Sequence, residues 1–189
     1  MRTTEITITG ITPLIVHNGQ LADPLNPFSR ELKEISGKRK KTDADHEAMA
    51  RIEFEGGLYF DEKEGPFMPA DCIEATICAG AKKSRIGKDV AAAVFVESEI
   101  VPIQYDGPRT VEGMWKDRER FVLRKACKVA TAKIMRTRPM IPTGWKITFS
   151  LAFDESIVNE AALRKAMIDA GALVGICDWR PRFGRFLVS

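Results

Sequence analysis

Basic and aromatic side chains alternate close to the end of the sequence. Residues 179–185 read Trp179, Arg180, Pro181, Arg182, Phe183, Gly184 and Arg185. Arginine binds phosphate through paired hydrogen bonds, aromatic rings stack on bases, and glycine lets a backbone approach closely. The segment therefore favours contact with nucleic acid. The alternative is a Trp and a Phe in the core, with arginines that point into solvent.

Two further basic segments have few acids around them. Residues 124–146 contain no Asp or Glu and include Arg124, Lys125, Lys128, Lys133, Arg136, Arg138 and Lys146. A shorter run is formed by Lys38, Arg39, Lys40 and Lys41. The net charge of +3 hides this bias, since residues 1–95 hold 13 Lys or Arg against 15 Asp or Glu, and residues 96–189 hold 16 against 11. Such clusters attract polyanions, so the expected partner is single-stranded RNA or DNA; a solvated basic face is the alternative.

Residue patterns for catalysis are weak. The sequence has no G-x-G-x-x-G, H-E-x-x-H or G-x-S-x-G pattern, and its cysteines form no C-x-x-C pair. We therefore expect a binding protein without a cofactor rather than an enzyme. Asp23 lies in an Asp-Pro turn, where it could act as an acid or a metal ligand near bound RNA. A metal-dependent ribonuclease that uses Asp23 is thus an alternative.

The sequence gives no sign of a membrane segment. No stretch approaches the ~18 consecutive apolar residues of a spanning helix. The N-terminal residues 1–6 contain no apolar run after their basic residue, unlike a secretory signal. We therefore expect a cytoplasmic protein with no membrane partner.

Hydrophobic periodicity predicts the elements that would position these residues. Alternation predicts strands over residues 4–9, 120–129 and 146–153, the last with Ile147, Phe149, Leu151 and Phe153 inward, and an extension of the first strand through Leu14–Val16. Helices are expected over 45–52, closed by Gly56 and Gly57, over 69–83, and after Asn159. Residues 17–41 are rich in turn formers, which predicts an irregular segment.

Short strands are also expected over 58–60, 66–68, 99–103 and 186–188, and the order of all these elements indicates an α+β fold. A β-α-β-β-α-β sequence of elements is typical of the ferredoxin-like (RRM-like) fold, in which two helices cover one face of an antiparallel sheet. We expect a single domain over residues 1–189. Residues 17–57 and 104–145 would be large loop or hairpin insertions in that core.

Two stretches resemble the RAMP superfamily, the ferredoxin-like RNA-binding proteins that include the backbone subunits of CRISPR effector complexes. Residues 66–75 resemble the strand-to-helix junction of that family, and residues 177–188 resemble its C-terminal glycine-containing loop. Asp178, Trp179 and Pro181 stand where the family is richer in glycine. No histidine lies where its processing endonucleases would use one.

The resemblance implies a binding mode. The chain would bind single-stranded RNA irrespective of sequence and assemble along it, as a homo-oligomer or within a multi-subunit complex. Residues 106–145 would correspond to the thumb-like hairpin of the family. A viral or phage assembly protein with a ferredoxin-like core, whose basic surface meets a protein partner, is the other alternative.

Overall fold

The computed structural model describes residues 1–189, apart from the side chain of Val129. The chain is an α+β protein with seven α-helices and antiparallel sheets among the described residues. It divides into two compact units. Unit 1 comprises residues 1–14, 60–106 and 141–189, and unit 2 comprises residues 15–59 and 107–140.

Unit 1 contains a seven-stranded sheet. Its strands are β1 (Arg2–Gly10), β3 (Phe60–Asp61), β4 (Gly65–Pro69), β5 (Val94–Val96), β6 (Ile100–Gln104), β9 (Lys146–Phe153) and β10 (Phe186–Val188). The order is β10-β1-β9-β6-β4-β3, and β5 also pairs with β9. The described pairings are antiparallel; Ile8, for example, lies opposite Ile147 of β9 and Val188 of β10. The chain therefore enters and leaves the sheet on neighbouring strands.

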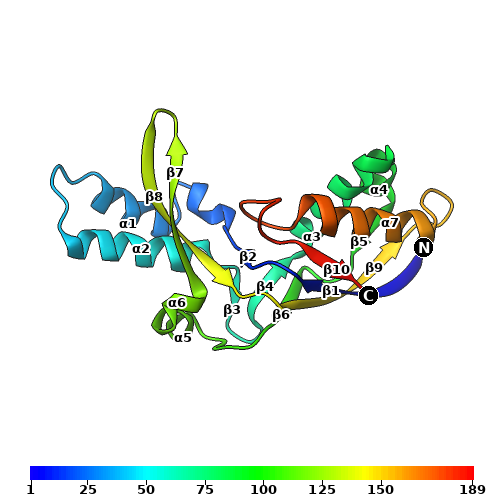
Figure 1. The fold of residues 1–189 in the computed structure, drawn as a ribbon, viewed down its shortest axis with the longest axis horizontal. Coiled ribbons are helices and arrows are strands. Elements are labelled where there is room, and N and C mark those ends of the chain that lie inside the picture. The colour runs from blue at the N-terminus through cyan, green and yellow to red at the C-terminus, as the bar shows by residue number, and fades with distance from the viewer. The chain divides into compact units, whose positions relative to one another are not determined.

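Two helices lie over this sheet in unit 1. The helical elements are α3 (Ala70–Ala81), the 3-10 turn η2 (Lys82–Ser84), α4 (Gly87–Ala93), α7 (Glu160–Asp169) and the π-turn η3 (Ala170–Val174). Figure 1 shows α3 and α7 side by side on one face of the sheet. A Cβ at Gly80 would lie 2.1 Å from the Ala166 carbonyl oxygen, so this close helix pairing requires glycine. The Asn159 side chain caps α7, as its position in the sequence predicts.

The core of unit 1 follows the alternation of the strands. Ile6 and Ile8 of β1 are buried, and on β9 the predicted inward residues Ile147, Phe149, Leu151 and Phe153 are buried too. The apolar residues of α3 and α7 close over them; Ile73, Ile77 and Met167 line a small void together with Ile8 and Phe149. The prediction of a strand over 146–153 with these residues inward is confirmed.

Unit 2 is a helix pair beside a long hairpin. Its elements are η1 (Gly19–Ala22), α1 (Pro27–Ser36), α2 (Asp43–Gly57), α5 (Val111–Lys116), α6 (Arg118–Phe121), β7 (Val122–Val129) and β8 (Ala132–Ile141), whose last residue belongs to unit 1. The strands β7 and β8 form an antiparallel hairpin. Its turn extends beyond α1 and α2 (Figure 1). The short strand β2 (Leu14–Ile15) pairs with β8 in a sheet of order β2-β8-β7, so the prediction that it extends the first strand was wrong.

The prediction of an irregular segment over residues 17–41 was also wrong, because α1 lies within it. Asn26 caps this helix with its side chain, which accepts a hydrogen bond from the Phe28 N–H, and Pro27 occupies the first turn. Asn-Pro is therefore a helix start here and not a loop turn. Phe28, Leu32 and Ile35 have the spacing of an apolar helix face, and α1 packs against α2.

The end of helix α2 and the start of strand β7 also differ from the prediction. The glycines expected to end α2 lie inside its last turn; a Cβ at Gly56 would come within 2.6 Å of the Leu21 side chain, so close packing selects glycine there. Residues 118–121 form α6, and the strand expected from Arg120 begins at Val122. No helix among the described residues combines the length and the apolar character that crossing a membrane demands.

Candidate nucleic-acid interface

The β7–β8 hairpin of unit 2 divides the basic run between two faces. Directly opposed residues of an antiparallel pair share a face, and faces alternate along a strand. Arg124 lies opposite Thr137, and Lys125 lies opposite Arg136. By this register, one face carries Arg124, Lys128 and Lys133, and the other carries Lys125, Arg136 and Arg138. The run that looks continuous in the sequence is therefore two separate sets of cations.

Arg136 holds the hairpin on helix α2. Its Nη1 lies 2.7 Å from Oε1 of Glu53, a carboxylate that is 5% exposed. The backbone N–H of Thr137 donates to the other oxygen of Glu53 at 2.7 Å. Glu53 thus neutralises Arg136 and satisfies an N–H at the edge of β8. The structure gives Arg136 a positioning role that the sequence did not suggest.

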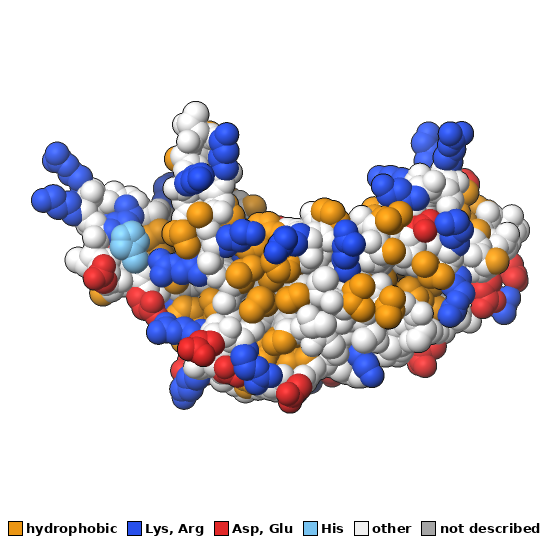
Figure 2. Space-filling view, viewed as in Figure 1, with side chains coloured by type: hydrophobic (Ala, Val, Ile, Leu, Met, Phe, Trp, Pro, Cys, Tyr) orange, Lys and Arg blue, Asp and Glu red, His pale blue; other side chains and the backbone are white. Residues whose placement is uncertain are grey.

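The other strand face, which adjoins α2 at Arg124 and Thr137, keeps its charges available. Among the described residues, Arg124, Lys128 and Lys133 form no ion pair or side-chain hydrogen bond, and all are exposed. Figure 2 shows Lys and Arg side chains over the hairpin and at the turn between α1 and α2. Exposed cations without acidic partners can neutralise phosphates at the lowest cost in free energy, because no ion pair within the protein has to be broken first.

A groove of about 670 Å³ lies between α2 and the hairpin, within unit 2. It is lined by Lys41, Asp43, His46, Glu47, Met49, Ala50, Glu53, Arg124, Ile134, Met135 and Thr137. Met49, Ile134 and Met135 offer apolar surface, Arg124 and Lys41 supply positive charge, and Asp43, Glu47 and Glu53 supply negative charge. The volume falls within the range of ligand pockets.

A second hollow of about 350 Å³ adjoins the groove and shares Arg124 with it. Trp115 of α5 lines this hollow. The Trp115 ring contacts Phe54 with 5.3 Å between centroids, and the guanidinium groups of Arg51 and Arg118 lie 5.1 and 5.6 Å from the Trp115 centroid. Sequence reasoning missed this cluster. Residues 115–121 hold two aromatic and three basic side chains, but the interspersed acids Asp117 and Glu119 hide the pattern.

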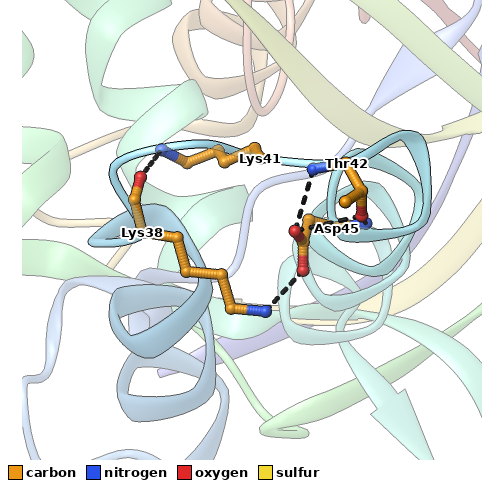
Figure 3. A network of polar contacts seen from close by, with 4 residues as sticks. All are labelled: Lys38, Lys41, Thr42 and Asp45. Carbon is orange, nitrogen blue, oxygen red and sulfur yellow. Dashed lines mark hydrogen bonds and ion pairs between the residues drawn. The ribbon is translucent and has the colours of Figure 1, made fainter.

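The basic run 38–41 is a structured turn in which two of the lysines are engaged (Figure 3). Lys38 Nζ lies 2.6 Å from Asp45 Oδ1, and Lys41 Nζ donates to the Lys38 carbonyl at 2.9 Å. Asp45 and Thr42 form the capping box of α2. The hydrogen bond from Lys38, together with that from the Thr42 backbone, lowers the pKa of Asp45 from 3.8 to about 2.

The other two residues of this run have a different environment. Arg39 and Lys40 are exposed and form no ion pair or side-chain hydrogen bond among the described residues. Within the run, these two are therefore the better candidates for contact with phosphate.

The C-terminal loop of unit 1 combines exposed arginines with half-buried aromatic rings. Trp179 and Phe183 contact each other with 6.3 Å between ring centroids, and Arg182 lies over Phe183. Arg185 Nε donates to the Pro181 carbonyl at 2.7 Å, which ties this arginine to the loop. Arg180 and Arg182 are exposed. The loop therefore offers two of its three arginines to a ligand.

Position 184 requires glycine for the sake of the loop's own packing, and not for the contact with nucleic acid that its sequence context suggests. It is buried at φ +70°, and a Cβ there would lie 2.0 Å from the Ile176 carbonyl oxygen. Its N–H donates to the Pro13 carbonyl at 2.9 Å. The loop's own backbone requires this glycine, so the interpretation that it makes room for a bound strand is replaced.

The residues with catalytic potential lie in ordinary surroundings. Asp23 is exposed, and its Oδ1 accepts a hydrogen bond from the Leu25 N–H. Among the described residues, no three His, Cys, Asp or Glu side chains are grouped so that they could hold a metal. A hydrogen bond with Cys72, together with burial, raises the pKa of the Cys177 thiol well above its usual value, so Cys177 stays protonated at neutral pH.

These observations describe an α+β protein with antiparallel sheets and exposed basic segments in both compact units. No protein-family model matches the chain, and no curated protein matches its sequence. A solved structure does share its fold: a chain in the cryo-EM structure of the Type III-B Cmr-beta bound to cognate target RNA, with a TM-score of 0.52 and 9% sequence identity. The match covers 100% of this chain and 59% of that one.

Proposed function

We propose that this chain is an RNA-binding subunit of a multi-subunit effector complex of the CRISPR type. The observation that carries the proposal is the fold match over the full length of the chain, since the matched Cmr-beta structure is described as bound to target RNA. The resemblance of residues 66–75 and 177–188 to RAMP proteins points the same way. RNA rather than DNA is proposed on these two grounds.

The strand order supports a ferredoxin-like core for unit 1. The successive strands β10, β1, β9 and β6 are antiparallel, and α3 and α7 connect them across one face. In chain order this is fourth, first, third and second, the arrangement expected of a split β-α-β fold. Unit 2 is then formed by two insertions in one domain, over residues 15–59 and 107–140.

The proposed contact is mainly electrostatic. Arg124, Lys128 and Lys133 on one face of the hairpin, with the adjoining groove, would hold the phosphate backbone of a single strand. Phosphate contacts carry no sequence information, so binding would be largely independent of sequence. Arg39 and Lys40 in unit 2 and Arg180 and Arg182 in unit 1 are further proposed contacts.

A titration with labelled oligonucleotides tests the proposal. A single-stranded RNA of ~30 nucleotides should bind at low salt, and a second RNA of unrelated sequence should bind with similar affinity. Single-stranded DNA of the first sequence serves as the comparison, and it should bind more weakly. Absence of binding to both RNAs at low salt, or binding of only one of them, contradicts the proposed function.

A further inference from the structure

A fourth basic cluster lies in unit 1, at the turn that joins α3 to α4. It comprises Lys82, Lys83, Arg85 and Lys88, which are all exposed. Residues 75–88 contain no Asp or Glu. Figure 2 shows Lys and Arg side chains gathered over this turn. The cluster is distinct from every basic segment discussed above.

These cations have no acidic partner among the described residues. None of the four forms an ion pair or a side-chain hydrogen bond. Two other cations of unit 1 are neutralised by acids: Arg2 pairs with Glu155 and Glu160, and Lys165 pairs with Asp169. The charges of the cluster therefore repel one another within a short turn, a cost that a bound polyanion would remove.

The turn that carries the cluster is well fixed. The Ile86 N–H donates to the Ala81 carbonyl and the Arg85 N–H to the Lys82 carbonyl, each at 3.2 Å. The Cys78 thiol donates to the Gly87 carbonyl at 3.2 Å. Gly87 leaves room for the Lys82 stem, whose Cγ would lie 2.6 Å from a Cβ at that position. A ligand would thus have to order only the ends of the side chains, which lowers the entropic cost of binding.

The composition of this surface distinguishes between two possible polyanions, an acidic protein and a nucleic acid. The cores of protein interfaces are depleted in lysine and enriched in aromatic residues. Three of the four cations here are lysines, and none of the exposed large apolar side chains of the described residues lies between 82 and 92. Lysine without an apolar anchor suits phosphates, which it binds as a point charge.

We propose that the α3–α4 turn is a second nucleic-acid contact, which binds the phosphodiester backbone through Lys82, Lys83, Arg85 and Lys88. The contact acts independently of the β7–β8 hairpin and goes beyond the proposed function. It gives unit 1 a polyanion-binding surface of its own, besides the arginines of the C-terminal loop. Binding there would be salt-dependent and independent of base sequence.

A charge-matched comparison tests this contact. The cluster variant is Lys82→Gln with Lys83→Gln and Lys88→Gln, which keeps the Lys82 Cγ over Gly87 and leaves the left-handed Arg85 unchanged. The control variant, Arg30→Gln with Lys33→Gln and Lys63→Gln, removes the same charge from exposed positions outside the proposed contacts. The probe is a labelled single-stranded RNA of ~30 nucleotides, and the readout is the slope of log affinity against log salt concentration.

The cluster variant should reduce this slope by about 2, because each phosphate neutralised on a single strand contributes about 0.7. The control should leave it nearly unchanged. Equal slopes for the two variants overturn the second contact. If variants of the β7–β8 hairpin nevertheless lose affinity for RNA, the proposed function remains intact. Polyglutamate that binds the wild-type protein but not the cluster variant, without displacing RNA from either, also overturns the second contact and assigns the turn to an acidic protein.

Discussion

Glu53 of α2 and Arg136 of β8 form an ion pair in unit 2, with 2.7 Å between Arg136 Nη1 and Glu53 Oε1. The carboxylate is almost fully buried, whereas the arginine side chain is 33% exposed. The pair joins α2 to a hairpin that also carries the exposed cations Arg124, Lys128 and Lys133. Arg136 therefore positions the hairpin, whereas the unpaired cations are able to bind a ligand.

The loss of Glu53 should destabilise the protein. Glu53→Ala leaves the Thr137 N–H and Arg136 without their acceptor, and the expected cost is about 3 kcal/mol of unfolding free energy. Glu53→Gln keeps an acceptor oxygen and should cost less. Glu155→Ala, which removes an exposed partner of Arg2, should cost less than about 1 kcal/mol and serves as control. Urea unfolding measures all three; equal losses for Glu53→Ala and Glu155→Ala would contradict the buried anchor.

Gly184 should tolerate no side chain. Gly184→Ala combines a positive φ with a Cβ 2.0 Å from the Ile176 carbonyl oxygen, so a loss on the order of 3 kcal/mol is expected. Gly144 also has a positive φ, but a Cβ there would meet nothing within 4 Å. Gly144→Ala therefore isolates the backbone strain and should cost about 1–2 kcal/mol. Chemical denaturation of both variants is the measurement, and a Gly184 variant as stable as the Gly144 variant would refute the clash.

The Lys38–Asp45 contact should give a defined pH dependence. The pKa of Asp45 is lowered from 3.8 to about 2 in the folded protein, so its contribution is present above about pH 4 and disappears as the pH falls towards 2. Thermal melting of the wild type and of Asp45→Asn should differ at pH 6, and the difference should shrink from pH 4 downward. A difference that is constant down to pH 2 would show that the charge of Asp45 plays no part.

Assembly along a strand is a separate expectation of the proposed function. RNAs of increasing length should yield complexes whose number of protein copies rises in even steps. Native gel electrophoresis or mass photometry with RNAs of ~15, ~30 and ~60 nucleotides measures the steps. A complex that contains one copy at every length would rule out assembly by this chain alone.

The regular elements of unit 1 could be predicted from the sequence because their signals are local. The strand over 146–153 alternates cleanly, and Asn159 lies immediately before the apolar stripe of α7. The helix α1 escaped prediction because Asn26-Pro27 signals either a turn or a helix start, and only its packing on α2 decides between them. Gly56 was misread as a helix end because the contact that requires it, with Leu21, is distant in the sequence.

The candidate site was harder to predict than the fold. Charge alone marked the run from Arg124 to Lys146, but only the strand register separates the two faces of its hairpin part, and only Glu53 shows that Arg136 is already paired. Trp115 was overlooked because acids surround it in the sequence, although in space it lines a hollow with Arg124. Partners far apart along the chain leave no local signal in one sequence.

The salt dependence of RNA binding by a hairpin variant tests the central claim most directly. Arg124→Gln with Lys128→Gln and Lys133→Gln removes the unpaired face of the hairpin, and the triple variant of Arg30, Lys33 and Lys63 again matches the charge. With a ~30-nucleotide RNA, the hairpin variant should bind more weakly and show a log–log salt slope shallower by about 2, while the control keeps the wild-type slope. A hairpin variant with wild-type affinity and slope would contradict RNA binding by this hairpin.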